Sequence, residues 1–210
     1  MHYSTRPLVL MILLTLMLCG LQPGIVQSQI RKNQQDPGRW RNLFDGKTLD
    51  GWKKTNYGGE GEINVTDGKI VMEFGYSMSG ITYNGTPLPL TNYEIRLDAV
   101  KLDGSDFFCG MTFPVADSHC SFIVGGWGGA VVGLSSIDGL DASENETTRY
   151  MNFSQDKWYR VRVRVEPHQI HCWLNRKLVV YQNIEGRKIT TRNEVNLNKP
   201  LGFGTWETRA

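Results

Sequence analysis

The sequence is poor in cysteine, in net charge and in segments with helical periodicity. It contains four cysteines, and 23 basic side chains stand against 21 acidic ones among 210 residues. A chain this close to neutral has no overall electrostatic attraction to nucleic acid or to an anionic membrane surface. C-x-x-C and G-x-S-x-G motifs are absent, which disfavours zinc sites, thiol redox chemistry and serine hydrolases. We therefore expect no nucleic-acid partner and no resident metal.

Only one long apolar run is present, from Leu8 to Leu18, and Arg6 precedes it. The run is too short to cross a bilayer, which takes about 20 apolar residues. A basic start, an apolar stretch and small residues at the exit are typical of a secretory signal peptide. Val26 and Ser28 suit the two small positions before the cleavage point. We therefore expect residues 1–28 to be removed and the mature protein, without a membrane span, to be secreted or periplasmic.

The rest of the sequence divides into a short segment and one domain. Residues 29–39 are polar and include Pro37 and Gly38, which is typical of a flexible N-terminal segment. About 180 residues remain after cleavage, enough for one hydrophobic core and too few for two. We expect a single domain over residues 40–210, of unknown oligomeric state.

Short β-runs separated by Gly, Asn, Asp and Pro fill this domain. In Tyr159–Glu166, apolar residues alternate strictly with charged ones, which indicates one buried and one solvated face. Further strands are predicted at Gly68–Phe74, Asn92–Val100, Asp106–Phe113, Cys120–Gly125, Ile170–Leu174 and Lys177–Gln182. Many short strands with frequent turns predict an all-β fold, a two-sheet antiparallel β-sandwich of the jelly-roll type.

Three cysteines belong to the predicted mature chain. Cys109 and Cys120 lie on two apolar runs joined by a short loop, so a disulfide between them would leave Cys172 free. Exported proteins commonly contain disulfides. Buried thiols also pack as small apolar residues, so the sequence leaves both alternatives open.

Several segments together resemble one protein family. LFDGKTLDGW (Leu43–Trp52) resembles the opening signature of the 3-keto-disaccharide hydrolase domain, also called domain of unknown function 1080. The run Trp158–Val165 followed by Ile170–Val180 resembles its late hairpin, and Pro200–Arg209 its closing segment. The resemblance implies a concanavalin A-like sandwich with a glycan site on a concave sheet, and hydrolysis of 3-keto-glycosides.

The sequence also departs from the family pattern. Catalytic members commonly carry an Arg on one strand, a Glu–Gln pair on the next and a late Gln-x-His. The corresponding segments here, Asp106–Val115, Cys120–Gly129 and the end of the chain, lack these residues. The family's catalytic residues therefore cannot be transferred. The family's last strand has no counterpart before Ala210, so we expect either a truncated sequence or a sheet that lacks one strand.

The most distinctive stretch is Gly125–Arg149. Glycines around Trp127 would let a ligand approach the backbone and the indole closely. An exposed indole face is suited to stacking on a sugar ring. The alternative is that Trp127 is a core aromatic residue at a bend of a sheet.

Four acidic residues follow in the same stretch, Asp138, Asp141, Glu144 and Glu146. Glycoside cleavage usually takes two carboxyl groups, and on a 3-keto sugar a base removes the C2 proton while an acid protonates the leaving oxygen. Asp138 and Glu144 are candidate catalytic residues, with Asp141 and Arg149 as candidate sugar contacts. The loop could also bind calcium, or could be simply solvated, with Arg149 offsetting its charge.

Three further candidates come from other strands. Asp106 is a substrate-binding candidate, although a cap at the strand entry explains it equally well. Glu73 becomes a catalytic candidate if its face of the strand is the concave one. Trp206, near the end of the chain, is a candidate for stacking on substrate.

A column of arginines shares one face of the clearest strand: Arg160, Arg162 and Arg164. The following strand can place His171 and Trp173 beside it. Such a surface could bind a sulfated or carboxylated polysaccharide. We favour cross-strand packing and charge pairing, with Glu94 and Asp98 as partners.

Two classes of function remain. One is an exported glycoside hydrolase-like domain that acts through a base and an acid on the concave face, with 3-keto-glycosides as the substrates that the resemblance implies. The other is a non-catalytic carbohydrate-binding module. In both, the partner is an oligosaccharide or a polysaccharide.

The predicted leader gives a first test. Expression of the whole chain in a bacterium with an intact secretion pathway should yield an exported protein that begins at Gln29. Mass spectrometry of the N-terminal peptide checks the cleavage point. An unprocessed protein retained inside the cell would contradict the prediction.

Overall fold

The computed structural model describes residues 40–210. The predicted signal peptide and the predicted flexible segment 29–39 lie outside the described residues. Asn42–Ala210 form one unit. In the part of the chain that the structure describes, no helix is long and apolar enough to cross a membrane.

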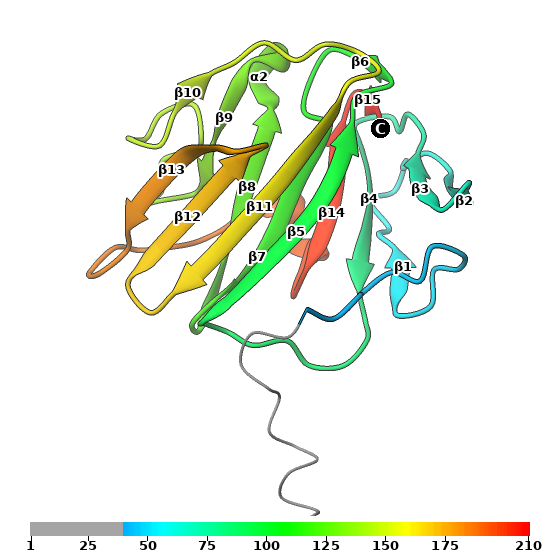
Figure 1. Cartoon of the computed structure of the whole chain (residues 1–210). Coiled ribbons are helices and arrows are strands. Elements are labelled where there is room, and N and C mark those ends of the chain that lie inside the picture. Colours follow the sequence, from blue (N-terminus) through cyan, green and yellow to red (C-terminus); the bar gives the residue numbers. More distant parts are fainter. Residues whose placement is uncertain (1–39) are drawn as a thin grey trace, which may run out of the picture. The chain divides into compact units, whose positions relative to one another are not determined.

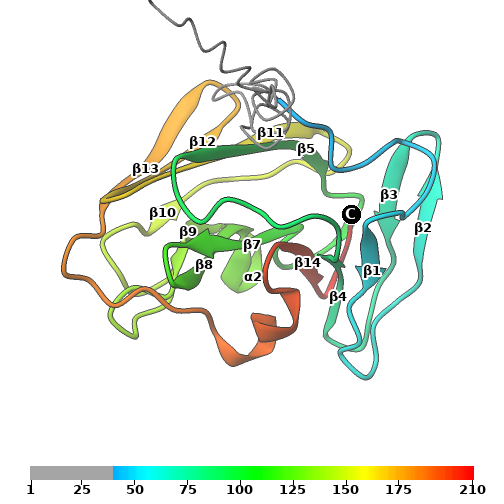
Figure 2. The ribbon, with the colours of Figure 1, turned by 90° about the horizontal axis from the view of Figure 1, so that it is seen from below.

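Two antiparallel sheets lie face to face (Figures 1 and 2). The larger sheet has the strand order β1 (Trp52–Lys54), β4 (Met78–Tyr83), β14 (Gly202–Trp206), β7 (Cys109–Val115), β8 (Ser118–Gly125), β9 (Val131–Ser135) and β10 (Arg149–Tyr150). The smaller sheet has the order β13 (Lys177–Asn183), β12 (Gln169–Leu174), β11 (Trp158–Glu166) and β5 (Tyr93–Val100). The predicted all-β sandwich is confirmed.

Short elements complete the domain. β2 (Ile63–Thr66) and β3 (Lys69–Met72) form a hairpin, and β6 (Asp103–Gly104) pairs with β15 (Thr208–Arg209). The turn α2 (Gly126–Gly129) joins β8 to β9, and the 3-10 helix η1 (Asn193–Asn198) precedes β14. β5 ends the four-stranded sheet, and within residues 40–210 no strand pairs with its outer edge.

The core lies between the two sheets. From the four-stranded sheet, the alternate residues Tyr159, Val161, Val163 and Val165 of β11 point inward and are buried. The facing sheet contributes a matching set that includes Met111, Phe113, Phe122, Val132 and Leu134. Burial of these side chains removes apolar area from water at roughly 25 cal/mol per Å². The same alternation points every other residue of each sheet to an outer face.

The predicted strands appear as β3, β5, β7, β8, β11, β12 and β13. The prediction did not include β1, β2, β4, β9 and β14 or the two-residue strands β6, β10 and β15. β4 and β9 are buried along their whole length, so they lack the alternation of apolar and charged residues that marks a half-solvated strand. β7 is equally buried and was recognisable only as an apolar run. β9 lies inside the glycine-rich stretch Gly125–Arg149, ahead of the acidic residues that the sequence placed in a loop.

The segment between β13 and β14, residues 184–201, crosses the outer face of the seven-stranded sheet (Figure 2). It pairs with the end of β9 through backbone hydrogen bonds between Ser136 and Thr190, of 2.8 and 3.1 Å. At its far end the Leu197 carbonyl accepts a 2.8 Å bond from the Thr82 hydroxyl on β4. We call residues 184–201 the crossing segment; it covers part of this face and places polar side chains on it.

All three described cysteines are buried free thiols. In the β7–β8 ladder Cys109 pairs with Val124, whereas Cys120 pairs with Phe113. The two cysteines are therefore four positions apart along the ladder, about 14 Å at 3.4 Å per residue. A disulfide needs Cα atoms within about 7 Å. The Cys109–Cys120 bridge, one of the two alternatives from the sequence, is wrong.

These thiols should be unreactive in the folded protein. Burial raises the pKa of Cys109 and that of Cys120 to about 12 and the pKa of Cys172 well above its ordinary value, and the thiolate is the reactive form. We expect a thiol reagent such as DTNB to label none of the three in the native mature protein and all of them in denaturant. Rapid labelling of one thiol in the native protein would contradict this.

Candidate functional site

The outer face of the seven-stranded sheet carries a small apolar cluster. It consists of Ile123 on β8, Val131 on β9 and Ala142 from the following loop, all buried, with Phe107 packed against them. We call these four residues the apolar floor. Because the neighbouring residues of β8 point into the core, the apolar floor lies on the side of the sheet opposite the core.

Trp127 stands beside the apolar floor on a turn that only glycines permit. Its backbone is left-handed, with φ of 49°, and its side chain is 41% exposed. A Cβ atom on Gly126 would lie 2.8 Å from Cγ2 of Ile123, and one on Gly129 would lie 2.9 Å from the carbonyl oxygen of Ser105. The turn therefore packs tightly on the sheet and holds the indole outward. The alternative that Trp127 is a core aromatic residue does not fit this exposed position.

Asp106 fixes the position of this turn through hydrogen bonds. Its carboxylate accepts hydrogen bonds from the backbone N–H groups of Gly128, at 2.8 Å, and Phe107, at 2.7 Å. The Phe107 carbonyl in turn accepts a 3.1 Å bond from the N–H of Trp206 on β14. Asp106 is thus a positioning residue for Trp127, close to the capping role that the sequence also allowed.

A charged cluster centred on Arg192 faces Trp127. The Arg192 guanidinium donates to the carboxylate of Asp141 and, at 2.9 Å, to that of Glu194. It lies 6.0 Å from the centre of the Trp127 ring, at the outer limit of a cation–π contact. The hydroxyls of Ser136 and Ser135 donate to the other oxygen of Asp141, at 2.9 and 3.2 Å.

Electrostatics favour the ionised forms of Arg192 and Glu194. The hydrogen bond from Arg192 lowers the pKa of Glu194, and the same pair raises the pKa of Arg192. The site therefore combines an exposed indole face with fixed charged donors and acceptors. These groups come from three segments: the α2 turn, the loop after β9 and the crossing segment.

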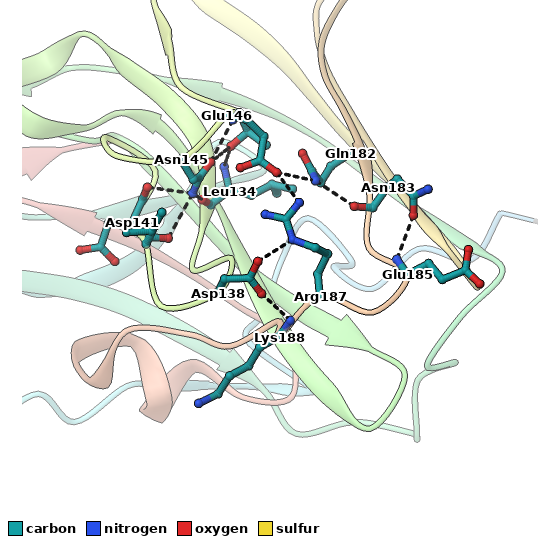
Figure 3. Close-up of polar contacts among 12 residues, drawn as sticks. Leu134, Asp138, Asp141, Asn145, Glu146, Gln182, Asn183, Glu185, Arg187 and Lys188 are labelled. Atoms are coloured by element: carbon teal, nitrogen blue, oxygen red, sulfur yellow. Dashed lines mark hydrogen bonds and ion pairs between the residues drawn. The ribbon is translucent and has the colours of Figure 1, made fainter.

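A second ionic network anchors the loop that carries Asp141 (Figure 3). Arg187 of the crossing segment bridges Asp138, at 2.5 Å, and Glu146, at 2.6 Å. Asp138 also accepts the backbone N–H of Lys188 at 2.7 Å, and Glu146 accepts from Gln182 on β13 at 2.9 Å. Both carboxylates thus hold the loop and the crossing segment together.

Asn145 fixes the interior of the same loop (Figure 3). Its buried amide nitrogen donates to the carbonyls of Leu134, Leu140 and Asp141, at 2.7, 3.1 and 2.8 Å. Its amide oxygen accepts from the backbone N–H and the hydroxyl of Thr147, at 2.9 and 2.6 Å. A buried amide with every bond made defines one loop conformation.

The remaining predicted site residues lie in different surroundings. Glu144 is exposed on the loop, and its carboxylate accepts the backbone N–H of Asp141 at 3.4 Å. Arg149 donates to the backbone carbonyls of its own loop at 3.1 and 2.7 Å. Glu73 is paired with Arg209 at 2.7 Å, beside the end of β3. Trp206, half-buried on β14, alternates with the inward-facing Phe203 and Thr205 and shares the outer face with the apolar floor.

The structure thus brings Trp127, Asp141 and Asp106 into one region, with Asp138 and Glu144 on the same loop as Asp141. Sequence analysis missed Arg192 and Glu194. They lie in a polar stretch without a motif, and Arg192 meets Asp141 only because the crossing segment returns over the sheet. No local pattern carries that information.

The carboxylates of the acidic loop do not converge on a single point. Among residues 40–210, no group of three or more His, Cys, Asp and Glu side chains is arranged to hold a metal ion. Instead, Arg187 forms ion pairs with Asp138 and Glu146, and Arg192 forms one with Asp141. The calcium alternative gains no support from this geometry.

The Arg187 bridge predicts an acid-dependent stability. The backbone N–H of Lys188 together with Arg187 lowers the pKa of Asp138, and chiefly Arg187 lowers that of Glu146. Carboxyl groups with lowered folded pKa values stabilise the fold above their unfolded values, about 4, and lose this contribution as the pH falls through the folded values. Arg187→Gln should therefore be less stable than wild type at pH 7, and the difference should shrink below about pH 4.

Urea unfolding of both proteins between neutral and acid pH measures this difference. Arg149→Gln is the matched control, because its guanidinium donates to backbone carbonyls, and we expect no comparable pH-dependent difference there. A stability difference for Arg187→Gln that stays constant down to the lowest pH would contradict the assignment.

Comparisons with known proteins agree with this fold. Among solved structures, the chain is similar to the carbohydrate-binding module CBM66 from Bacillus subtilis, with a TM-score of 0.52, 15% identity and coverage of 76% of this chain and 89% of that one. It is also similar to the Crh5 transglycosylase in complex with NAG, with a TM-score of 0.46, 12% identity and coverage of 78% and 65%. At 15% identity, the likeness to CBM66 shows the fold alone. A comparison with curated proteins finds no match.

A family model gives the assignment that the sequence motifs anticipated. The model of the 3-keto-alpha-glucoside-1,2-lyase-like domain matches residues 39–208, which include both sheets, the α2 turn and the crossing segment. The match spans more than half of the chain. The chain therefore belongs to the 3-keto-alpha-glucoside-1,2-lyase-like domain family.

Proposed function

We propose that the domain binds a saccharide on the outer face of the seven-stranded sheet, against the exposed part of the Trp127 indole and beside Arg192. The observation that carries the proposal is the exposed indole beside the Asp141–Arg192–Glu194 ion cluster. A sugar ring offers an apolar C–H face and a rim of hydroxyl groups. The indole suits the first, and charged donors and acceptors suit the second.

The rigidity of these groups supports a binding role. Trp127 is fixed by the glycine turn and by Asp106, and Asp141 by Arg192 and two serine hydroxyls. Groups that are already ordered lose little conformational entropy when a ligand arrives. The predicted leader further suggests that the domain meets its saccharide outside the cytoplasm.

Trp127→Ala tests the proposal. We expect affinity for the best ligand in a panel of gluco-disaccharides and their 3-keto derivatives to fall by about ten- to a hundredfold, as for a central aromatic contact. Isothermal titration calorimetry of the purified mature protein gives the value.

Trp158→Ala is the matched control. Trp158 is also an exposed tryptophan, 49% accessible, but it lies at the start of β11 in the other sheet. Its loss should leave the affinity unchanged. Equal effects of the two substitutions, or an unchanged affinity in Trp127→Ala, would remove Trp127 from the site.

The second candidate is the reaction that the family description names, elimination from a 3-keto-glycoside. The base removes the proton at C2, its electron pair forms the C1–C2 double bond, and the C1–O bond breaks. The leaving oxygen takes a proton, so a conjugated enone and a free alcohol are formed. The C3 ketone makes the C2 proton acidic, and this reaction needs one base and one acid.

Glu144 is the best-placed base for this reaction. Among the described residues no ion pair engages its carboxylate, and it lies beside Asp141 on the exposed side of the loop. Asp138 and Glu73 are the less suited candidates, because a proton on either would weaken its bond to Arg187 or Arg209. Asp141 and Arg149 remain candidate sugar contacts, and Trp206 a candidate for stacking.

Chromogenic 3-keto-glucosides and the matching unoxidised glucosides test the reaction. An active lyase should release the chromophore from the keto substrates alone, and Glu144→Gln should lower the rate by at least about a hundredfold. Glu166→Gln, on β11 of the other sheet, serves as the control variant and should leave the rate unchanged. Sugar binding without any release would leave the domain as a binding module and exclude the catalytic candidate.

A further inference from the structure

A row of aromatic residues continues from Trp127 across the seven-stranded sheet. Because neighbouring strands of this sheet are antiparallel, the end of β8, the start of β7, the end of β14 and the start of β4 lie at the same end of it (Figure 1). Each of these strand ends has an aromatic residue in it or beside it: Trp127 follows β8, Phe107 precedes β7, Trp206 ends β14 and Tyr76 precedes β4. We call these four residues the aromatic row.

Backbone hydrogen bonds connect the members of the aromatic row. The Phe107 carbonyl accepts a 3.1 Å bond from the N–H of Trp206. The N–H of the next residue, Glu207, donates at 2.9 Å to the carbonyl of Ser77, the neighbour of Tyr76 in the chain. The row therefore has a fixed backbone from the Trp127 turn, which Asp106 ties to Phe107, as far as Tyr76.

Tyr57 lies at the same end of the row as Tyr76. The turn that follows Tyr57 is fixed by Glu60, whose carboxylate accepts the backbone N–H groups of Tyr57, Gly58 and Gly59 at 3.0, 3.0 and 3.2 Å. The N–H of Tyr76 donates to the Gly59 carbonyl at 2.7 Å. The two tyrosines therefore stand on segments that are bonded to each other.

Three glycines beside the aromatic row let rings lie directly on the backbone of the sheet. Gly80, Gly204 and Gly110 stand opposite one another on β4, β14 and β7. They belong to the outer face, because a residue adjacent to each along its strand packs in the core. A Cβ atom on Gly110 would lie 2.9 Å from the Phe107 ring, and one on Gly80 would lie 3.1 Å from the hydroxyl oxygen of Tyr57. Side chains at these positions would therefore displace the two rings.

The aromatic row presents ring surface and polar groups to solvent together. Tyr76 is 94% exposed and Trp127 is exposed, while Phe107 and Trp206 are half-buried. Among residues 40–210, no hydrogen bond engages the indole N–H of Trp127, that of Trp206 or the hydroxyl of Tyr76. Rings of this kind suit successive units of a sugar chain, because each unit offers a C–H face for stacking and hydroxyl groups for the polar tips.

The length of the aromatic row exceeds one sugar ring. Neighbouring strands lie about 4.8 Å apart, so the three steps from β8 to β4 cover about 14 Å. Trp127 and Tyr76 stand at the two ends of this distance. A single sugar ring stacked on Trp127 would therefore leave Trp206 and Tyr76 without a ligand contact.

We propose that the aromatic row extends the saccharide site, so that the ligand is a gluco-oligosaccharide of at least trisaccharide length. One end of the chain lies at Trp127, beside the ion cluster of Arg192, and the following units pass over Phe107 and Trp206 to Tyr76. The chain thus runs across the strands, at the end of the sheet where the row lies. This inference rests on the function proposed for Trp127 and adds the class of ligand and the direction in which it lies.

A series of chain lengths tests the extension. Cello-, laminari- and malto-oligosaccharides, each from the disaccharide to the tetrasaccharide, are titrated into the mature protein by isothermal titration calorimetry. In at least one series we expect the tetrasaccharide to bind at least about tenfold more tightly than the disaccharide, because the longer chain reaches further aromatic rings. Equal affinities of disaccharide and tetrasaccharide in every series would overturn the extension.

Two variants remove the far part of the extended site. Tyr76→Ala, at an almost fully exposed ring, should reduce the ratio of tetrasaccharide to disaccharide affinity by at least about threefold. Trp206→Leu keeps an apolar side chain on the sheet but loses the flat ring, and should reduce the same ratio. Trp127→Ala should instead weaken both ligands, because both occupy that end of the site. Thermal unfolding of each variant verifies that the sheet is intact.

Tyr181→Ala is the matched control. Tyr181 is also an exposed tyrosine, but it lies on β13 of the other sheet. The charge pairing that the sequence analysis favoured accounts for the arginines of that sheet, with Arg160 bound to Asp98 at 2.8 Å and Arg164 to Glu94 at 2.9 Å. The loss of Tyr181 should leave the ratio of affinities unchanged.

The outcomes separate failure of the extension from failure of the saccharide site itself. A ratio of affinities that survives both Tyr76→Ala and Trp206→Leu, or that falls equally in Tyr76→Ala and Tyr181→Ala, would overturn the extension and leave the site at Trp127 in place. Unchanged affinities for the disaccharide and the tetrasaccharide in Trp127→Ala would overturn the saccharide site, and the extension with it.

Discussion

The backbone ladder between residues 136–138 and 188–190 is the constraint on which the candidate site depends. Ser136 and Thr190 exchange both hydrogen bonds, and the N–H of Asp138 donates to the Lys188 carbonyl at 2.8 Å. This pairing fixes the crossing segment to the loop after β9. Arg187 and Arg192 then reach carboxylates about fifty residues away in sequence. Without the ladder, the glycine turn would still position Trp127, but Arg192 and Glu194 would have no fixed position beside it.

A sandwich of this kind has two outer faces, and here they differ in chemistry. On the seven-stranded sheet, a tightly packed glycine turn and an apolar floor hold one indole beside an ion cluster in which Arg192 pairs with two carboxylates. On the four-stranded sheet, Arg162 and Arg164 pair with Glu94, and Arg162 stacks on Trp173. The saccharide site that we propose belongs to the first face. Family membership is consistent with a role in carbohydrate chemistry and does not assign either face.

Alternation located β11 most clearly, because its outward residues are charged, while β4 and β9, buried on both sides, gave no such signal. β7 is also buried on both sides and was predicted only from its apolar run. Trp127 was identifiable from its glycine neighbours. Arg192 was not, because its importance arises from a long-range return of the chain. The disulfide alternative failed since it required a register that a seven-residue β7 and a two-residue turn do not produce.

The most direct test of the account follows the indole N–H signals of the six tryptophans in two-dimensional NMR spectra of the mature protein. Trp127→Phe assigns one signal, and the protein is titrated with a neutral or 3-keto gluco-disaccharide. The account predicts a saturable shift of the Trp127 signal, while the signals of Trp52, in the core, and Trp173, on the other sheet, stay in place. Shifts at Trp173 with an unchanged Trp127 signal would contradict the assignment of the site to the outer face of the seven-stranded sheet.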